Sequence, residues 1–170
     1  MPYRNKLYIA FDGDTDMVYY RTLQMWKSNG SIDFNFYNAH DLNTARDSSL
    51  SDSIKAQLRE RMLNSKTMLL LVGSNTKYLR LFVPYEIKLA RKLDIPIIVA
   101  NINKKRTYDD SRCPATLKDN VATVHVSFEM KIISHALANF PSWYHANNSK
   151  KIYRTHQLSY PATVYSGLGL

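Results

Sequence analysis

The sequence predicts one α/β domain in which a five-stranded parallel sheet, in the order 2-1-3-4-5, lies between two layers of helices. Segments rich in apolar residues alternate along the chain with segments of helical periodicity, the pattern of successive βαβ units. Met68–Val72 and Ile97–Ala100 are apolar without alternation, as expected of central strands that helices cover on both faces. A chain of 170 residues has the length of one domain with one substantial core.

The predicted strands are short and rich in β-branched, aromatic and other apolar residues. In chain order they are Leu7–Phe11, Phe34–Tyr37, Thr67–Val72, Pro96–Ile102 and Thr123–Phe128. The segments between them are long enough for crossover connections, which parallel neighbours require.

Four segments have the periodicity of amphipathic helices. They are Asp16–Lys27, Leu50–Asn64, Leu81–Leu93 and Met130–Tyr144. Asp16 is expected to cap the first helix, and Ser51 or Asp52 the second, because short polar side chains accept hydrogen bonds from exposed helical N–H groups. Pro141 is expected to interrupt or end the last helix because it has no N–H to donate.

Residues 1–146 are predicted to form this domain. Residues 147–170 contain Ser, Tyr, Pro and Gly without strong periodicity, which indicates a C-terminal tail or a surface-packed extension. Residues 103–120 are predicted to be mainly loop, with a short helix near Ala115–Lys118.

Composition excludes several classes of protein. The N-terminus leads into the first strand without the apolar stretch of a secretory signal, and the longest apolar runs are far shorter than the roughly 20 residues that span a bilayer. Cys113 is the only cysteine, so the chain has neither an intramolecular disulfide nor a four-thiolate metal site. We therefore expect a cytoplasmic protein without membrane association.

The net charge is +9, from 23 basic and 14 acidic residues. The basic residues are spread over the predicted helices, with small concentrations at Lys104–Arg106 and Lys150–Lys151. A nucleic-acid-binding protein usually gathers such charge on one face, so a solvated surface is expected instead. The five histidines lack the spacing of metal ligands, and no metal site is predicted.

In a sheet of this order, ligands bind beyond the carboxyl ends of the strands where the winding reverses, here between the first and third strands. That rule selects the loops Asp12–Asp16 and Gly73–Thr76. The acidic loop suggests a phosphoacceptor receiver, but the third strand ends without a carboxylate and the fifth without a lysine. No glycine-rich phosphate-binding motif is present. Asp14 and Asp16 are expected in a solvated loop and a helix cap.

Glu86 is the most informative residue. It lies near the middle of the apolar arc of its predicted helix, which is formed by Phe82, Val83, Ile87, Leu89, Ala90 and Leu93. Burying an ionised carboxylate costs several kcal/mol unless it is paired or lines a wet cavity. Glu86 is therefore either a functional carboxylate or a structural one held by an arginine or a tyrosine hydroxyl, and the pattern leaves both open.

Four motifs occur in the order typical of one family: Tyr8–Asp12, Asp33–Tyr37, Met68–Gly73 and Phe82–Ile87. On these motifs the chain resembles TIR-like domains of the bacterial Thoeris anti-phage ThsB type, over about Lys6 to Asn103. The resemblance implies a flavodoxin-like TIR fold. It also implies cleavage of the nicotinamide–ribose bond of NAD, often releasing a cyclic ADP-ribose isomer as a signal.

Glu86 aligns with the catalytic glutamate of that family. The resemblance further implies a substrate site with walls from Phe11, Asp12, Gly73, Ser74 and Phe82, with NAD as substrate and no bound cofactor. Association into a homo-oligomer on activation, and a downstream effector that reads a nucleotide signal, are likewise implied.

Two positions depart from the family pattern. Phe82 stands where the family usually has tryptophan, which keeps an aromatic ring but loses the indole N–H. Pro84 replaces a usual acidic residue. The alternative to an enzyme is a TIR adaptor that assembles with other proteins, in which Glu86 is structural.

Overall fold

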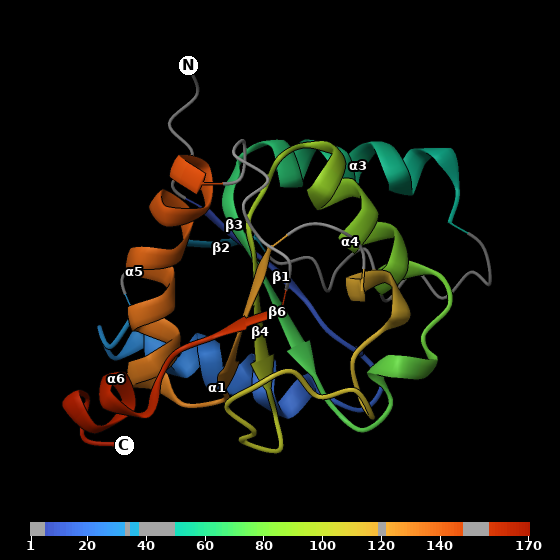
Figure 1. Ribbon diagram of the computed structural model, residues 1–170. Helices are drawn as coiled ribbons and strands as arrows, with labels where there is room; N and C mark the ends of the chain where they lie inside the picture. The colour runs from blue at the N-terminus through green and yellow to red at the C-terminus, as the bar shows by residue number, and fades with distance from the viewer. Residues whose placement is uncertain (1–5, 33–34, 38–49, 119–121, 148–156) are drawn as a thin grey trace.

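The computed structural model describes residues 6–32, 35–37, 50–118, 122–147 and 157–170 (Figure 1). One sheet runs through the molecule, and all of its neighbouring strands are parallel. From edge to edge its strands are β2 (Asn35–Tyr37), β1 (Lys6–Ala10), β3 (Ser65–Val72), β4 (Ile97–Asn101), β5 (Thr123–Ser127) and β6 (Gln157–Ser159). The five predicted strands are present in the predicted order, although residue 34, the first of the second predicted strand, lies outside the described residues.

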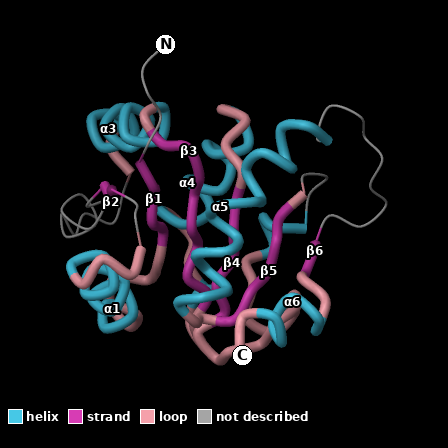
Figure 2. The backbone as a smooth tube through the Cα atoms, turned by 90° about the vertical axis from the view of Figure 1, so that its left-hand side faces the viewer, coloured by secondary structure: helices cyan, strands magenta, loops and turns pink. Residues whose placement is uncertain are grey.

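Within the described residues the sheet has six strands, so the prediction of five was wrong. Figure 2 shows β6 at the edge of the sheet beside β5, where Thr123 is in register with Gln157 and His125 with Ser159. Its three residues include a single apolar side chain, Leu158, so the sequence shows no apolar run that would indicate a strand there. It leads into α6 (Ala162–Gly167), whose Tyr165 is buried in the core.

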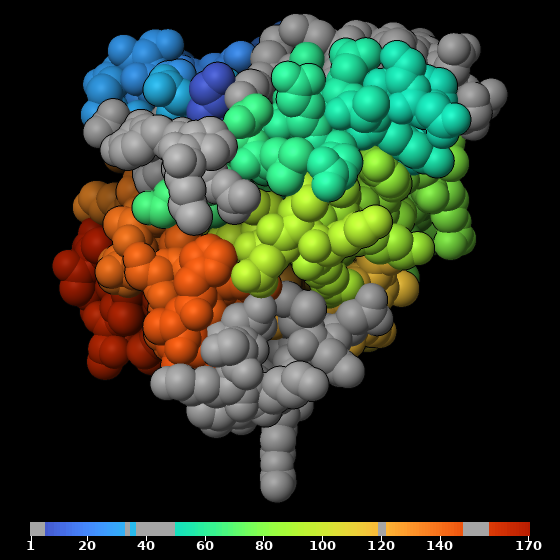
Figure 3. Space-filling view, turned by 90° about the horizontal axis from the view of Figure 1, so that it is seen from above, coloured from blue at the N-terminus to red at the C-terminus, as the bar shows by residue number. Residues whose placement is uncertain are grey.

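Helices cover both faces of this sheet, which confirms the three-layer α/β architecture of a flavodoxin-like fold (Figure 1). The side chains of α1 (Met17–Ser28), α5 (Met130–Asn147) and α6 fill the core on one face. Those of α3 (Asp52–Leu63) and α4 (Phe82–Lys92) fill the core on the other. Figure 3 shows α3 and α4 beside each other on that face. Alternate residues along each central strand therefore point into different cores.

Of the two predicted helix caps, the one on α3 is confirmed and the one on α1 is wrong. Ser51 caps α3, because its Oγ accepts a hydrogen bond of 3.3 Å from the Ile54 N–H. Asp16 occupies the N-cap position of α1, but its side chain makes no capping hydrogen bond, so that prediction was wrong. The carboxylate turns inward against the loop after β3 instead. The predicted short helix is present as η2 (Ala115–Lys118), and a second one, η1 (Thr76–Tyr78), follows β3.

Pro141 does not end the last helix, contrary to the prediction, because α5 continues to Asn147. A proline inside a helix removes one backbone hydrogen bond and costs about 3 kcal/mol. Beyond it, Tyr144 is buried in the core and donates a hydrogen bond of 3.1 Å to Asp94. Burial of an aromatic side chain contributes about 1.5–3 kcal/mol, which helps to offset the interruption. Within the described ranges, no helix combines the length and the apolar character needed to cross a bilayer.

Candidate active site around Glu86

Glu86 faces the sheet from α4 and is completely buried, with 0% of its surface exposed. This burial is the one expected from the helical spacing, because Val83, Ile87 and Ala90 on the same side of α4 are buried in the same core. The position inferred from the sequence is therefore confirmed. A carboxylic acid occupies a place that the pattern reserves for an apolar side chain.

The Tyr8 hydroxyl, from the middle of β1, donates a hydrogen bond of 2.5 Å to Glu86 Oε1. Among the described residues, none donates to the other carboxyl oxygen, Oε2. The sequence left open whether Glu86 is a functional carboxylate or a structural one held by an arginine or a tyrosine hydroxyl. In the structure a tyrosine hydroxyl does hold Glu86, but it bonds only one of the two carboxyl oxygens. The second oxygen is a buried acceptor without a donor, which is uncommon in folded proteins and is costly.

Burial raises the pKa of Glu86 from 4.5 to about 7, and the hydrogen bond from Tyr8 acts in the opposite direction. Burial also raises the pKa of Tyr8, and the negative charge of Glu86 adds to that rise, while the positive charge of Arg61 lowers it. The carboxyl group therefore changes protonation near neutral pH. Such a group can act either as an acid or as a negative charge under ordinary conditions.

A second group of polar side chains lies at the carboxyl ends of β1 and β3, where the winding reverses. Asp12 is buried and joins the two loops: its Oδ2 accepts from Thr15 Oγ1 at 2.8 Å and from Asn75 Nδ2 at 3.2 Å. Its Oδ1 accepts from the Asp14 N–H at 3.0 Å. Asp14 is exposed, as predicted for a loop residue.

Asp16 is also buried, and its carboxylate lies directly over Gly73. A methyl group added at Gly73 would lie 2.4 Å from Asp16 Oδ2, so only glycine allows this close approach. Among the described residues, none donates to Asp16 Oδ2. Burial raises the pKa of Asp16, and the charge of Asp12 adds to the rise.

Replacing Gly73 by alanine is expected to lower the free energy of unfolding by about 1–3 kcal/mol, because the added methyl group forces the Asp16 carboxylate to move. Urea unfolding would measure the loss. In an Asp16→Ala background the same replacement should cost less than half as much, because the obstructing carboxylate is gone. Additive losses in the double variant would contradict this reading of the contact.

The structure separates the other predicted site residues. Phe11 belongs to the core on the opposite face of the sheet from Glu86, where it stacks on Tyr20 with ring centroids 4.9 Å apart. Phe82 is half-buried on the same helix as Glu86 and packs against the same core. Ser74 is exposed beside Gly73 in the loop after β3. Phe82 thus shares a layer with Glu86, whereas Asp12, Gly73 and Ser74 gather at the winding reversal.

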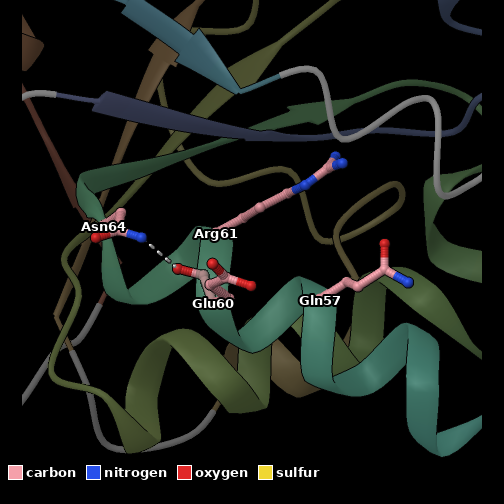
Figure 4. A pocket seen from close by; sticks show the side chains of 4 residues that line it. All are labelled: Gln57, Glu60, Arg61 and Asn64. Carbon is pink, nitrogen blue, oxygen red and sulfur yellow. Dashed lines mark hydrogen bonds between the residues drawn. The ribbon is translucent and has the colours of Figure 1, made fainter.

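The described residues line two of the molecule's pockets. One, of about 220 Å³, lies along α3, and Figure 4 shows the side chains that line it: Gln57, Glu60 and Arg61 from that helix, and Asn64, its C-cap residue. The other, of about 290 Å³, lies between α5 and the sheet edge and is lined by Val124, Asn139, Phe140, Trp143, Leu158, Ser159 and Tyr160. Glu86 lines neither pocket. Arg61, which lines the first, lowers the pKa of Tyr8, the hydrogen-bond partner of Glu86, through its positive charge.

Tyr8 and Asn75 were not predicted from the sequence as site residues. Tyr8 has the signal of an ordinary strand residue, and a tyrosine hydroxyl was only a general alternative for the partner of Glu86. Asn75 lies in a loop that was selected by topology, yet its bond to Asp12 joins residues 63 positions apart. In the described part of the chain, no three His, Cys, Asp or Glu side chains come together as metal ligands would. His40 and His156 lie outside the described residues.

Comparison with known proteins agrees with the motifs. The family model described as "Thoeris protein ThsB, TIR-like domain" matches residues 8–107, a span that begins within β1 and includes Tyr8, Gly73 and Glu86. None of the curated proteins compared with the chain matches it. The match covers more than half of the 170 residues and nearly the whole span of the resemblance. The chain therefore belongs to the Thoeris ThsB TIR-like domain family and is a TIR-type defence domain.

Proposed function

We propose that this protein consumes NAD in anti-phage defence by cleaving the bond between nicotinamide and ribose. Membership of the ThsB TIR-like family supports this proposal. The observation that carries it is the Glu86 carboxyl group, which is fully buried in α4, bonded through one oxygen and without a donor among the described residues at the other. Stability alone does not favour such a group, and unsatisfied buried carboxylates are concentrated at functional sites.

Glu86 would act as a fixed negative charge. When the bond from the ribose C1′ to the nicotinamide nitrogen breaks, its electron pair leaves with nicotinamide and positive charge develops on the ribose. An ionised carboxylate stabilises that charge, and it does so more strongly in a water-poor site than in solution. With a pKa of about 7, Glu86 is ionised in about half of the molecules at neutral pH.

The ribosyl cation then reacts with a nucleophile. Water gives ADP-ribose, whereas an adenine or ribose atom of the same molecule gives a cyclic ADP-ribose isomer, with loss of one proton in each case. Cyclisation requires that water be kept from the cation. The low polarity around Glu86 favours cyclisation, so we propose a cyclic ADP-ribose-type signal for a downstream effector.

NAD cannot touch a carboxyl group that is 0% exposed, so the proposal requires an opening step. Closure in the single chain agrees with an enzyme that completes its site only when copies associate. We propose a homo-oligomer as the active form, with NAD bound as substrate and no resident cofactor.

The proposal is tested by incubating the purified protein with NAD over a wide range of protein concentrations and separating the products by chromatography. Nicotinamide release should rise more steeply than in proportion to protein concentration. A cyclic product should appear with it. Absence of nicotinamide at every concentration, and in extracts of phage-challenged cells that express the protein, would overturn the proposal.

The second candidate is a TIR adaptor without enzymatic activity. The Tyr8–Glu86 bond favours it, because a hydroxyl group that donates to a carboxyl group inside a core can also serve a purely structural role. An adaptor would associate with its partners equally well as the wild type and as the Glu86→Gln variant, and it would leave NAD intact in every assembled state.

A further inference from the structure

Tyr8 and Glu86 form a direct link between the sheet and α4. Both side chains are 0% exposed, and their oxygen atoms are 2.5 Å apart. This distance is at the short end for a hydroxyl bonded to a carboxylate, a class of hydrogen bond about twice as strong as one between neutral groups. The residues are 78 positions apart in the sequence, so only the fold brings them together.

The bond makes the two carboxyl oxygens of Glu86 unequal. Oε1 is held by Tyr8, whereas Oε2 has no donor among the described residues. Rotation of the carboxyl group would break the only hydrogen bond that the described residues give it. The group is therefore held in one orientation before any ligand arrives.

We propose that Tyr8 is a positioning residue that fixes the Glu86 carboxyl group and leaves Oε2 as the oxygen that acts on the substrate ribose. This inference rests on the proposed function. Filling space does not require the hydroxyl, because Ala10 and Met68, which lie in the same core as Tyr8, are apolar, and phenylalanine would occupy nearly the same volume. A buried hydroxyl costs stability unless it is bonded, so its presence beside Glu86 points to the bond itself.

The bond also affects the pH at which Glu86 becomes charged. Tyr8 is the one described group that lowers the pKa of Glu86, against the larger effect of burial. The charged or titratable groups that act on Tyr8 from the elements packed around it are Arg61 of α3 and Tyr85 of α4. Neither is itself bonded to Glu86 among the described residues, so removing the Tyr8 hydroxyl should leave Glu86 harder to ionise.

Tyr8→Phe tests the proposal through two measurements. The first is the pKa of Glu86, followed by NMR of ¹³C-labelled glutamate carboxyl groups, with the signal assigned by its loss in Glu86→Gln. The second is the pH profile of nicotinamide release. The Glu86 pKa should rise in Tyr8→Phe, and the acid limb of the kcat profile should move to higher pH by the same amount. A rise of one pH unit would lower the rate at pH 7 about fivefold.

Tyr144→Phe is the matched control, because it also removes a buried tyrosine hydroxyl, but Tyr144 belongs to the core on the other face of the sheet and donates to Asp94 instead of Glu86. It should leave both measurements unchanged. Incorporation of 3-fluorotyrosine at position 8 keeps the hydroxyl and makes it a stronger donor, so the Glu86 pKa should fall. These opposite shifts separate positioning from a general loss of stability.

An unchanged or lowered Glu86 pKa in Tyr8→Phe would overturn the inference, as would an acid limb that stays in place while the wild type is active. If the Glu86 pKa rises but the wild type releases no nicotinamide in any state, the proposed function fails. The Tyr8–Glu86 pairing then remains as a structural bond, and the positioning role is overturned with the function.

Discussion

Replacing Glu86 by glutamine is expected to lower the rate of nicotinamide release by about 10²–10³-fold, the effect typical of removing one preorganised electrostatic group from an active site. Glutamine keeps the shape of the side chain and can still accept the hydrogen bond from Tyr8. It cannot carry a negative charge at any pH. The rate should be measured as nicotinamide released, at the protein concentration where the wild type is most active.

Glu60→Gln is the matched control for that experiment. Glu60 lies exposed on α3, so the same chemical change there should leave the rate of nicotinamide release unaltered. Loss of activity in Glu86→Gln should appear in kcat more than in KM, because the charge acts on the cation that forms during the reaction. Equal turnover by the wild type and Glu86→Gln would remove the carboxylate from the mechanism and favour the adaptor.

The second large effect is on the pH dependence of stability. Two buried groups, Glu86 and His125, change the free energy of unfolding in opposite directions as the pH rises. Glu86 has a pKa raised from 4.5 to about 7 in the folded protein. Its contribution to stability is therefore fully present below pH 4.5 and is lost as the pH rises towards 7. At about 1.4 kcal/mol for each pH unit, the loss amounts to about 3 kcal/mol.

His125 acts in the other direction. Its ring is 0% exposed in β5, its Nε2 lies 3.0 Å from Thr123 Oγ1, and the Tyr108 ring packs edge-on against it at 5.3 Å between centroids. Burial lowers its pKa from 6.5 to about 4. The unfolded chain thus takes up a proton that the folded protein resists, and about 3 kcal/mol of stability is lost as the pH falls from 6.5 to 4.

Between pH 4.5 and 6.5 the two effects on the free energy of unfolding should nearly cancel in the wild type. A variant that removes one of the two groups should show the pH dependence caused by the other. The stability of Glu86→Gln is expected to fall as the pH is lowered, because the His125 slope remains. The stability of His125→Gln should fall as the pH is raised, because the Glu86 slope remains. Urea unfolding at intervals from pH 4 to 8 measures both. Parallel curves for the wild type and either variant would contradict the assignment of that group.

The sequence was sufficient for the parts of this fold that depend on repetition. The apolar runs of β3 and β4 required cover on both faces, and helical spacing placed Glu86 among Val83, Ile87 and Ala90. Such patterns repeat every two or three to four residues, so a short segment already contains them. β6 contains one apolar residue between two polar ones, which does not stand out from the loop around it, and this edge strand was therefore missed.

Local rules failed where a distant contact opposed them. Asp16 has the residue type and position of a helix cap, but the absence of a side chain at Gly73 lets its carboxylate turn inward. Pro141 should end a helix by its own chemistry, but the buried Tyr144 beyond it helps to hold α5 together. In both cases a tertiary contact outweighs a local preference of a few kcal/mol or less.

By itself, the sequence determined the layered parallel sheet, the family and the inward-facing carboxylate of Glu86, since each follows from spacing within a segment or from the order of motifs. Only the tertiary structure decided that Tyr8 holds one oxygen of that carboxylate, that Phe11 lies on the opposite face of the sheet, and that Asp12 ties two loops together. These contacts join residues that are close only after the sheet has assembled. No local pattern encodes which side chain will stand opposite another across a core.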